Sequence, residues 1–166
     1  MKETGINHFL NKLGFDSGSF KVFYTFEEGA GIQINSISGG QSPYAGTIIG
    51  GVNDFWNSPG SGFFSGNYVQ IANSSGLYSD AFTHLFVFNK KNAENALLLS
   101  TLTGNSGYNI GITSTNKIYF ETYNNNPIVA ASYNNISSEN LISVSYLQNS
   151  VSIGYYNFNA KSFEVE

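Results

Sequence analysis

Apolar and polar residues alternate along much of the chain after residue 20. The segment "FKVFYTF" (residues 20–26) alternates and is rich in aromatic and β-branched residues. Successive side chains of an extended chain point to opposite faces, so alternation predicts a strand with one buried face. The segment "FTHLFVFN" (residues 82–89) is apolar on both faces, which is typical of a central strand covered on both sides. The same criteria predict strands at residues 46–52, 68–72, 95–102, 108–113, 117–123, 127–133, 141–147 and 151–158.

Short polar segments separate the strands predicted for the second half of the chain. These segments are "TGNSG", "STN", "NNN", "NNISSEN" and "QNS", and they consist largely of the residues that favour tight turns. Strands recur about every ten residues, and no second helical pattern of useful length follows residue 20. The pattern therefore predicts an all-β fold, either a sandwich or a barrel.

The stretch "FSGNYVQIAN" (residues 64–73) combines a glycine-asparagine turn with a strand. Gly66 permits a tight entry into the strand. We expect Tyr68, Val69 and Ile71 to be mainly packing residues, with Gln70 on the side opposite its neighbours. Ligand contacts are therefore expected in the loops that flank this strand.

The first 19 residues differ from the rest, because their apolar residues have helical spacing. Positions i, i+3, i+4 and i+7 form one face of a short helix, and Gly14 follows where a helix would end. A helix this short is not stable alone, so its apolar face must dock on something. It either covers one end of its own domain or anchors the chain to a partner. The residues of this face are Ile6, Phe9, Leu10 and Leu13.

Composition restricts the classes of function. The length of 166 residues suits one domain, and a content of 41% hydrophobic residues excludes a disordered chain. Only 11% of residues are charged, the net charge is −4, and there is no Arg, so the clustered cations that nucleic acid requires are missing. There is no Cys. The N-terminal segment lacks an apolar run long enough for a signal peptide or a membrane span.

The order of motifs resembles the concanavalin A-like lectin/glucanase superfamily, in its laminin-G-like branch. The motifs that carry the resemblance are "VFYTFEEGAG", "GTIIGG", Trp56 within "DFWNSPGSGFFSGNYVQIAN", "FTHLFVFNKK", "ALLLST", "YNIGI", "KIYFET" and "ISVSYL…VSIGYYN". The resemblance implies an antiparallel β-sandwich or jelly roll over residues 20–166, preceded by the anchor segment of residues 1–19.

Two features depart from this family. Where members often have Trp in the "F-W-V" strand, this chain has Phe86 or Val87. The sequence stops at "KSFEVE", whereas members usually continue with one or two strands that close a sheet. Because an open edge strand is a hazard, we expect either a longer polypeptide or an edge completed by a neighbour.

Catalytic chemistry is not expected. The family's glucanases carry an E-x-D arrangement on one strand, and retaining hydrolysis needs two carboxylates about 5 Å apart. No E-x-D or D-x-E occurs in this sequence. Glu164 and Glu166 are interpreted as part of an exposed terminal strand, and Glu27 and Glu28 are adjacent, so each pair has a structural explanation. His84 is expected to be a satisfied, partly buried residue rather than a base.

Calcium is the cofactor to consider, because many members of the family bind it with loop carboxylates and carbonyls. Calcium takes six to eight oxygen ligands, usually including several carboxylates. The chain has only Asp16, Asp54 and Asp80 besides its Glu residues, and Asp80 is the best single candidate. We expect no cofactor, with calcium at Asp80 as the weaker alternative.

Glycan binding remains the main candidate activity. Sugars stack on aromatic faces and bind to amides and hydroxyls, and the chain is rich in Tyr, Asn and Ser. A tyrosine on a strand is more often a packing residue. The loop residues Trp56, Asn57 and Tyr78 are therefore the predicted glycan contacts.

Three functional hypotheses remain. The first, implied by the resemblance, is a non-catalytic structural or adhesion protein of a virus particle, specifically of a bacteriophage tail, fibre or capsid. Its partners would be other virion proteins, bound through the N-terminal segment in a homo-oligomer or symmetric assembly, and a cell-surface glycan. The second is a carbohydrate-binding module of a bacterial surface protein or larger enzyme, located outside the cell or on its surface. The third, a degenerate glycosidase, is disfavoured by the missing carboxylates.

Overall fold

The computed structural model contains β-strands that pair antiparallel throughout, and its described residues include no α-helix. The predicted helix of residues 1–19, with Ile6, Phe9, Leu10 and Leu13, lies outside the described part. No helix in the described part is long and apolar enough to cross a membrane. The structure describes residues 21–22, 24, 26, 28–36, 44–51, 55–58, 61–62, 64, 66–71, 77, 79, 81–89, 94–103, 106–123, 128–132, 140–148, 150–157 and 162–165.

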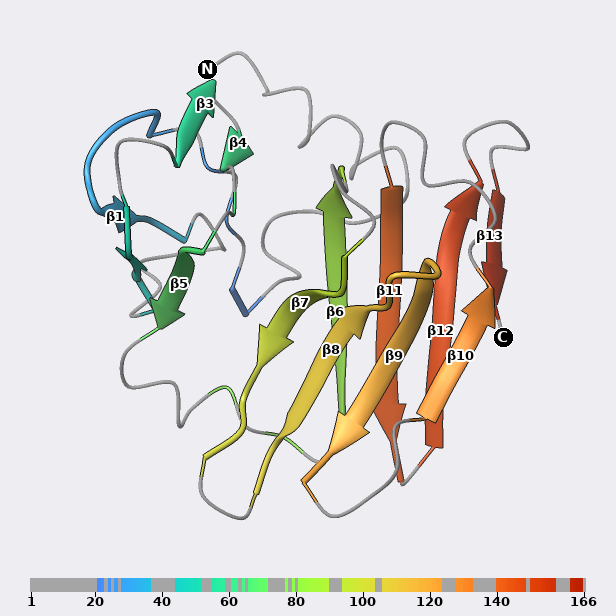
Figure 1. Cartoon of the computed structure of the whole chain (residues 1–166). Coiled ribbons are helices and arrows are strands. Elements are labelled where there is room, and N and C mark those ends of the chain that lie inside the picture. Colours follow the sequence, from blue (N-terminus) through green and yellow to red (C-terminus); the bar gives the residue numbers. More distant parts are fainter. Residues whose placement is uncertain are drawn as a thin grey trace. The chain divides into compact units, whose positions relative to one another are not determined.

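The chain divides into two compact units, Met1–Tyr78 and Ser79–Glu166. The second unit contains two four-stranded sheets, drawn one in front of the other in Figure 1. The front sheet has the order β10-β9-β8-β7, and the back sheet has the order β13-β12-β11-β6. The front strands are β7 (Ala96–Ser100), β8 (Tyr108–Ile112), β9 (Lys117–Thr122) and β10 (Ile128–Ser132). The back strands are β6 (Ala81–Phe88), β11 (Asn140–Leu147), β12 (Ser150–Asn157) and β13 (Ser162–Val165).

The inner faces of these two sheets form one hydrophobic core. Because side chains alternate along a strand, every second residue of each central strand points inward. The pairing register aligns these residues across the back sheet, where Ile142 lies opposite Phe86 and Val144 opposite His84. The arrangement is that of a β-sandwich, as the alternation predicts. The buried cluster consists of Ile110, Ile118 and Phe120 from the front sheet and of Ile142, Val144 and Ile153 from the back sheet.

Stacked aromatic rings extend this core toward one end of the sandwich. The ring of Phe82 stacks on Tyr108 with centroids 4.6 Å apart and on Tyr146 at 5.4 Å. Phe120 stacks on Tyr108 at 5.4 Å and on Tyr146 at 5.8 Å. Offset aromatic pairs contribute about 0.5–1.5 kcal/mol each beyond the burial of their area. The stack therefore helps to hold the two sheets together.

The first unit is built around a small sheet with its own core. The strands β1 (Gln33–Ile34), β2 (Gly46–Ile49) and β5 (Tyr68–Ile71) pair in the order β1-β2-β5. The strands β3 (Trp56–Ser58) and β4 (Ser61–Gly62) form a separate hairpin. Ile34, Ile48 and Phe55 are buried, and Tyr24, Phe26, Trp56 and Val69 pack against them.

Two local predictions for this unit were wrong. The first is the strand at residues 20–26, because Lys21, Val22, Tyr24 and Phe26 lie outside any strand. Phe26 has a φ of 56°, which an extended chain cannot have, and its ring packs instead near Phe55. The second is the packing role of Tyr68, which is 56% exposed. The tyrosine lies on the same side of β5 as the exposed Gln70, whereas Val69 and Ile71 are half-buried.

Candidate functional site

The predicted glycan contact Trp56 is held in place by its own unit. Its indole N–H donates a hydrogen bond to the carbonyl oxygen of Gly31 at 2.8 Å. Its ring meets Phe55 edge to face, with centroids 5.0 Å apart. The indole is half-buried and its single donor is used, so Trp56 has a structural role in this unit whatever else it contacts.

The other predicted contacts lie wholly or partly outside the described residues. Asn57 is in β3, but its side chain lies outside the described part, as do Tyr78 and Asp80 altogether. Whether Trp56, Asn57 and Tyr78 come together therefore stays a prediction. No group of three or more His, Cys, Asp or Glu residues that could hold a metal ion occurs among the described residues.

The outer face of the front sheet carries an aromatic side chain that lies against a glycine. Gly111 of β8 and Tyr119 of β9 are direct cross-strand partners. Both point outward, because their neighbours Ile110, Ile118 and Phe120 point into the core. A Cβ atom at Gly111 would lie 2.5 Å from the Cζ and hydroxyl oxygen of Tyr119. The phenol ring therefore leans across β8 over the space that a side chain would otherwise occupy.

Within the described part, the ring and the hydroxyl group of Tyr119 are available to bind a ligand. No described aromatic ring lies against it, and its hydroxyl group makes no hydrogen bond to a described residue. The side chain is half-buried. Burial, and secondarily the carboxylate of Glu121, raise the pKa of the Tyr119 hydroxyl, so the phenol is neutral near pH 7. The ring thus offers an uncharged aromatic surface with a hydroxyl group at its end.

Asn109 and Glu121 form the next cross-strand pair on the same face. Each lies two residues along its strand from Gly111 or Tyr119, so the four positions form a two-by-two array. The Nδ2 atom of Asn109 donates to Oε2 of Glu121 across 3.4 Å, which is a long hydrogen bond. Oδ1 of Asn109 is buried and accepts no hydrogen bond in the described part. We call Asn109, Gly111, Tyr119 and Glu121 the Tyr119 platform.

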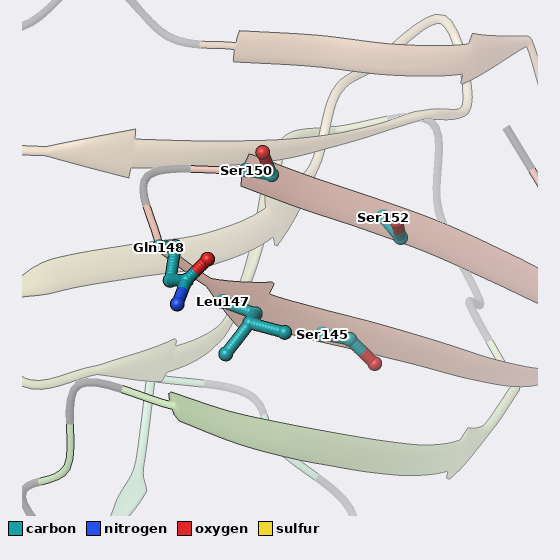
Figure 2. Close-up of a pocket in the computed structure, with 5 residues that line it drawn as sticks. All are labelled: Ser145, Leu147, Gln148, Ser150 and Ser152. Atoms are coloured by element: carbon teal, nitrogen blue, oxygen red, sulfur yellow. The ribbon is translucent and has the colours of Figure 1, made fainter.

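The outer face of the back sheet has a shallow hollow of about 360 Å³ beside the turn between β11 and β12. Figure 2 shows Ser145 and Leu147 on β11, Ser150 and Ser152 on β12, and Gln148 in the turn between them. Three of its five lining residues are serines, and Leu147 supplies an exposed apolar surface. These residues were not predicted as a site, because serines that alternate with apolar residues indicate the solvent-facing side of a strand.

His84 lies between the sheets and not at a surface site. Its Nε2 atom lies 2.7 Å from the hydroxyl oxygen of Tyr108, and its ring is 4.7 Å from that of Phe82. Burial lowers the pKa of His84 to about 4, so it is neutral at pH 7. The prediction of a satisfied, partly buried histidine is confirmed.

The sequence contained one signal for the Tyr119 platform. A glycine inside a strand often marks close approach by another group, and "YNIGIT" has such a glycine at Gly111. Tyr119 was one of several strand tyrosines, and nothing local distinguished it. Only the register of β8 and β9 identifies it as the residue that covers Gly111.

Comparisons with family models, with curated proteins and with solved structures found no match to this chain.

Proposed function

We propose that this chain is a non-catalytic adhesion module that binds glycan through the Tyr119 platform. The observation that carries the proposal is the Tyr119 ring, which leans over Gly111 beside the amide of Asn109 and the carboxylate of Glu121. A sugar presents an apolar C–H face and a rim of hydroxyl groups. An aromatic ring matches that face, and the carboxylate oxygens of Glu121 can accept hydrogen bonds from its hydroxyls.

The number of carboxylates in the front strands favours glycan binding over glycan hydrolysis. Glu121 is the single acidic residue within the sequences of β7, β8, β9 and β10. Glycosidases of the usual kinds need two carboxyl groups flanking the bond that they cleave. A single carboxylate beside a tyrosine can orient a sugar. Hydrolysis would need a second carboxyl group, which these strands do not contain.

The setting that we propose is a virus particle. The order of sequence motifs resembles laminin-G-like domains of the concanavalin A-like superfamily, which are common on bacteriophage virions, and the two-sheet sandwich of residues 79–166 agrees with that class of fold. The apolar face of Ile6, Phe9, Leu10 and Leu13 would then dock on another virion protein. The alternative setting is a carbohydrate-binding module of a bacterial surface protein or larger enzyme.

A glycan array probed with the purified chain tests the binding activity. We expect binding to at least one glycan and a roughly tenfold loss of affinity in Tyr119→Ala, because the stacking surface is removed. Tyr68→Ala is the control, since Tyr68 is also a strand tyrosine but is exposed and belongs to the other unit. Its binding should equal that of the wild type.

Two results would contradict this site. If no glycan binds, the adhesion activity is wrong. If glycan binding survives Tyr119→Ala but is lost in Tyr78→Ala, the loop hypothesis is right and the platform is not the site. Mass spectrometry of purified particles then addresses the setting, because stable incorporation favours the virion and an attached catalytic domain in the encoding gene favours the alternative.

A further inference from the structure

We infer that the hollow on the back sheet is a second binding site, which takes a neutral hydroxylated ligand of about the size of one sugar residue. The hollow opens on the outer face of β11 and β12, and the Tyr119 platform lies on the outer face of the front sheet. The two sites therefore lie on opposite faces of the same sandwich, and neither requires the other.

Hydroxyl groups are arranged in register across three strands at this place. Ser145 is paired with Thr83 of β6 on one side and with Ser152 of β12 on the other. All three residues point outward, because their neighbours Val144, Tyr146 and Ile153 belong to the core. Adjacent strands are about 4.8 Å apart, so these three side chains leave the sheet in one row across the strands.

Much of the hydrogen-bonding capacity of the hollow is unused by the protein. The hydroxyls of Thr83 and Ser145 lie 3.0 Å apart and are paired. The side chains of Gln148, Ser150 and Ser152 make no hydrogen bond to any described residue. A hydroxyl can both donate and accept, and an amide does the same through two different atoms. Such a lining complements a ligand whose own hydroxyls both donate and accept.

The charge of the lining selects against ions. The strands β6, β11 and β12 contain no Asp, Glu, Lys or Arg, and their only ionisable side chain near pH 7, His84, points into the core. An anion or a cation bound here would lose hydration without meeting an opposite charge from these strands. The ligand class that fits is therefore neutral.

The size and the apolar part of the hollow also fit a sugar ring. Its volume of about 360 Å³ is at the lower end of the range of roughly 300–1,000 Å³ for small-molecule sites. Leu147 is 58% exposed within it and can cover the C–H face of a ring. Gln148 extends from the adjoining turn (Figure 2) with a φ of 49°, a conformation that a glycine would adopt more easily.

Nuclear magnetic resonance titration of the full chain tests this site directly. The probes are the methyl glycosides of glucose, galactose and N-acetylglucosamine, with glucuronic acid and N-acetylneuraminic acid as anionic counterparts and glycerol as a small polyol. We expect saturable shifts of the amide signals of Ser145, Leu147, Gln148, Ser150 and Ser152 with at least one neutral glycoside. The expected Kd is about 1–10 mM, as befits a shallow site with a few hydrogen bonds.

Matched variants localise the effect. Ser150→Lys fills the hollow and introduces a charge, so the shifts should disappear. Ser114→Lys makes the same change at an exposed turn between β8 and β9, and its titration should match the wild type. Ser152→Ala removes one hydroxyl and should weaken binding about fivefold. Tyr119→Ala should leave these shifts intact, which separates this site from the platform.

The inference is overturned by any of three results. These are the absence of saturable shifts with every neutral glycoside, shifts that persist in Ser150→Lys, and shifts that glycerol reproduces at equal concentration. Binding of the anionic sugars as tightly as the neutral ones would overturn the proposed selectivity.

Discussion

The Nε2 atom of His84 lies 2.7 Å from the hydroxyl oxygen of Tyr108, and this contact joins the two sheets of residues 79–166. His84 comes from β6 of the back sheet and Tyr108 from β8 of the front sheet. Phe82 stacks on Tyr108 beside them. The pair is thus a polar contact among aromatic rings. If this hydrogen bond is lost, its polar atoms do not easily find other partners there.

Acid should destabilise the protein through His84. Burial lowers its pKa from 6.5 to about 4 in the folded state, so between these values the unfolded state binds more protons. The contribution of His84 to the free energy of unfolding is therefore fully present above about pH 6.5, and it is lost as the pH falls toward 4. We expect the wild type to lose roughly 2–3 kcal/mol of unfolding free energy over this window from this group. Urea unfolding at several pH values measures the loss.

The variant His84→Gln provides the control for the acid effect. Glutamine does not titrate, so the difference in unfolding free energy between pH 7 and pH 4.5 should shrink even if the variant is less stable overall. Equal pH dependence in the two proteins would show that other groups, such as carboxylates, cause the acid sensitivity.

Tyr108→Phe should destabilise the protein while preserving the stacked rings. The change removes the hydroxyl and leaves Nε2 of His84 without that partner, at a cost of about 1–2 kcal/mol. Tyr123→Phe is the matched control, because Tyr123 is 46% exposed. Chemical denaturation of both variants makes the comparison, and equal stabilities would mean that the inter-sheet hydrogen bond contributes nothing.

Gly111→Ala should disturb both stability and the Tyr119 platform. The added methyl group would lie 2.5 Å from the Tyr119 ring and 2.6 Å from the carbonyl oxygen of Ala96, so ring and backbone must both shift. We expect a loss of about 1–3 kcal/mol and weaker glycan binding. Gly51→Ala, where no atom lies within 4 Å of the new methyl group, should be nearly neutral. A Gly111→Ala variant as stable as Gly51→Ala would contradict the close approach.

Gln148→Gly should stabilise the turn between β11 and β12. Gln148 has a φ of 49°, where a residue with a Cβ atom is strained, and we expect a gain of about 0.5–1 kcal/mol in unfolding free energy. Asn116→Gly is the comparison, since Asn116 has a φ of 61° and asparagine tolerates this conformation better. Thermal unfolding should show the smaller gain for Asn116→Gly, and the reverse order would indicate that the Gln148 side chain makes a stabilising contact.

Local patterns were sufficient to predict most strands of the second unit. The patterns of "LISVSYL" and "VSIGYYN" predict strands, and β11 and β12 lie there, with Ile142, Val144 and Ile153 in the buried cluster. The same kind of pattern failed at residues 20–26, because a positive φ at Phe26 depends on packing and leaves no mark on hydrophobicity. The strands β1 and β4 were not predicted, because a strand of two residues is too short to show an alternating pattern.

The sequence by itself determined which side chains are available and, where apolar and polar residues alternate clearly, where a strand forms, since both depend on neighbours along the chain. It did not determine the exposure of Tyr68 or of Val87, although Val87 lies in a segment that is apolar on both faces. The tertiary structure alone decided which strands lie next to each other and in what register. That register places Tyr119 opposite Gly111 and aligns Thr83, Ser145 and Ser152, although Thr83 and Ser145 are far apart in sequence. Strand pairing is non-local and a shift of one residue reverses every face, so both proposed sites come from the folded register and from no motif in the chain.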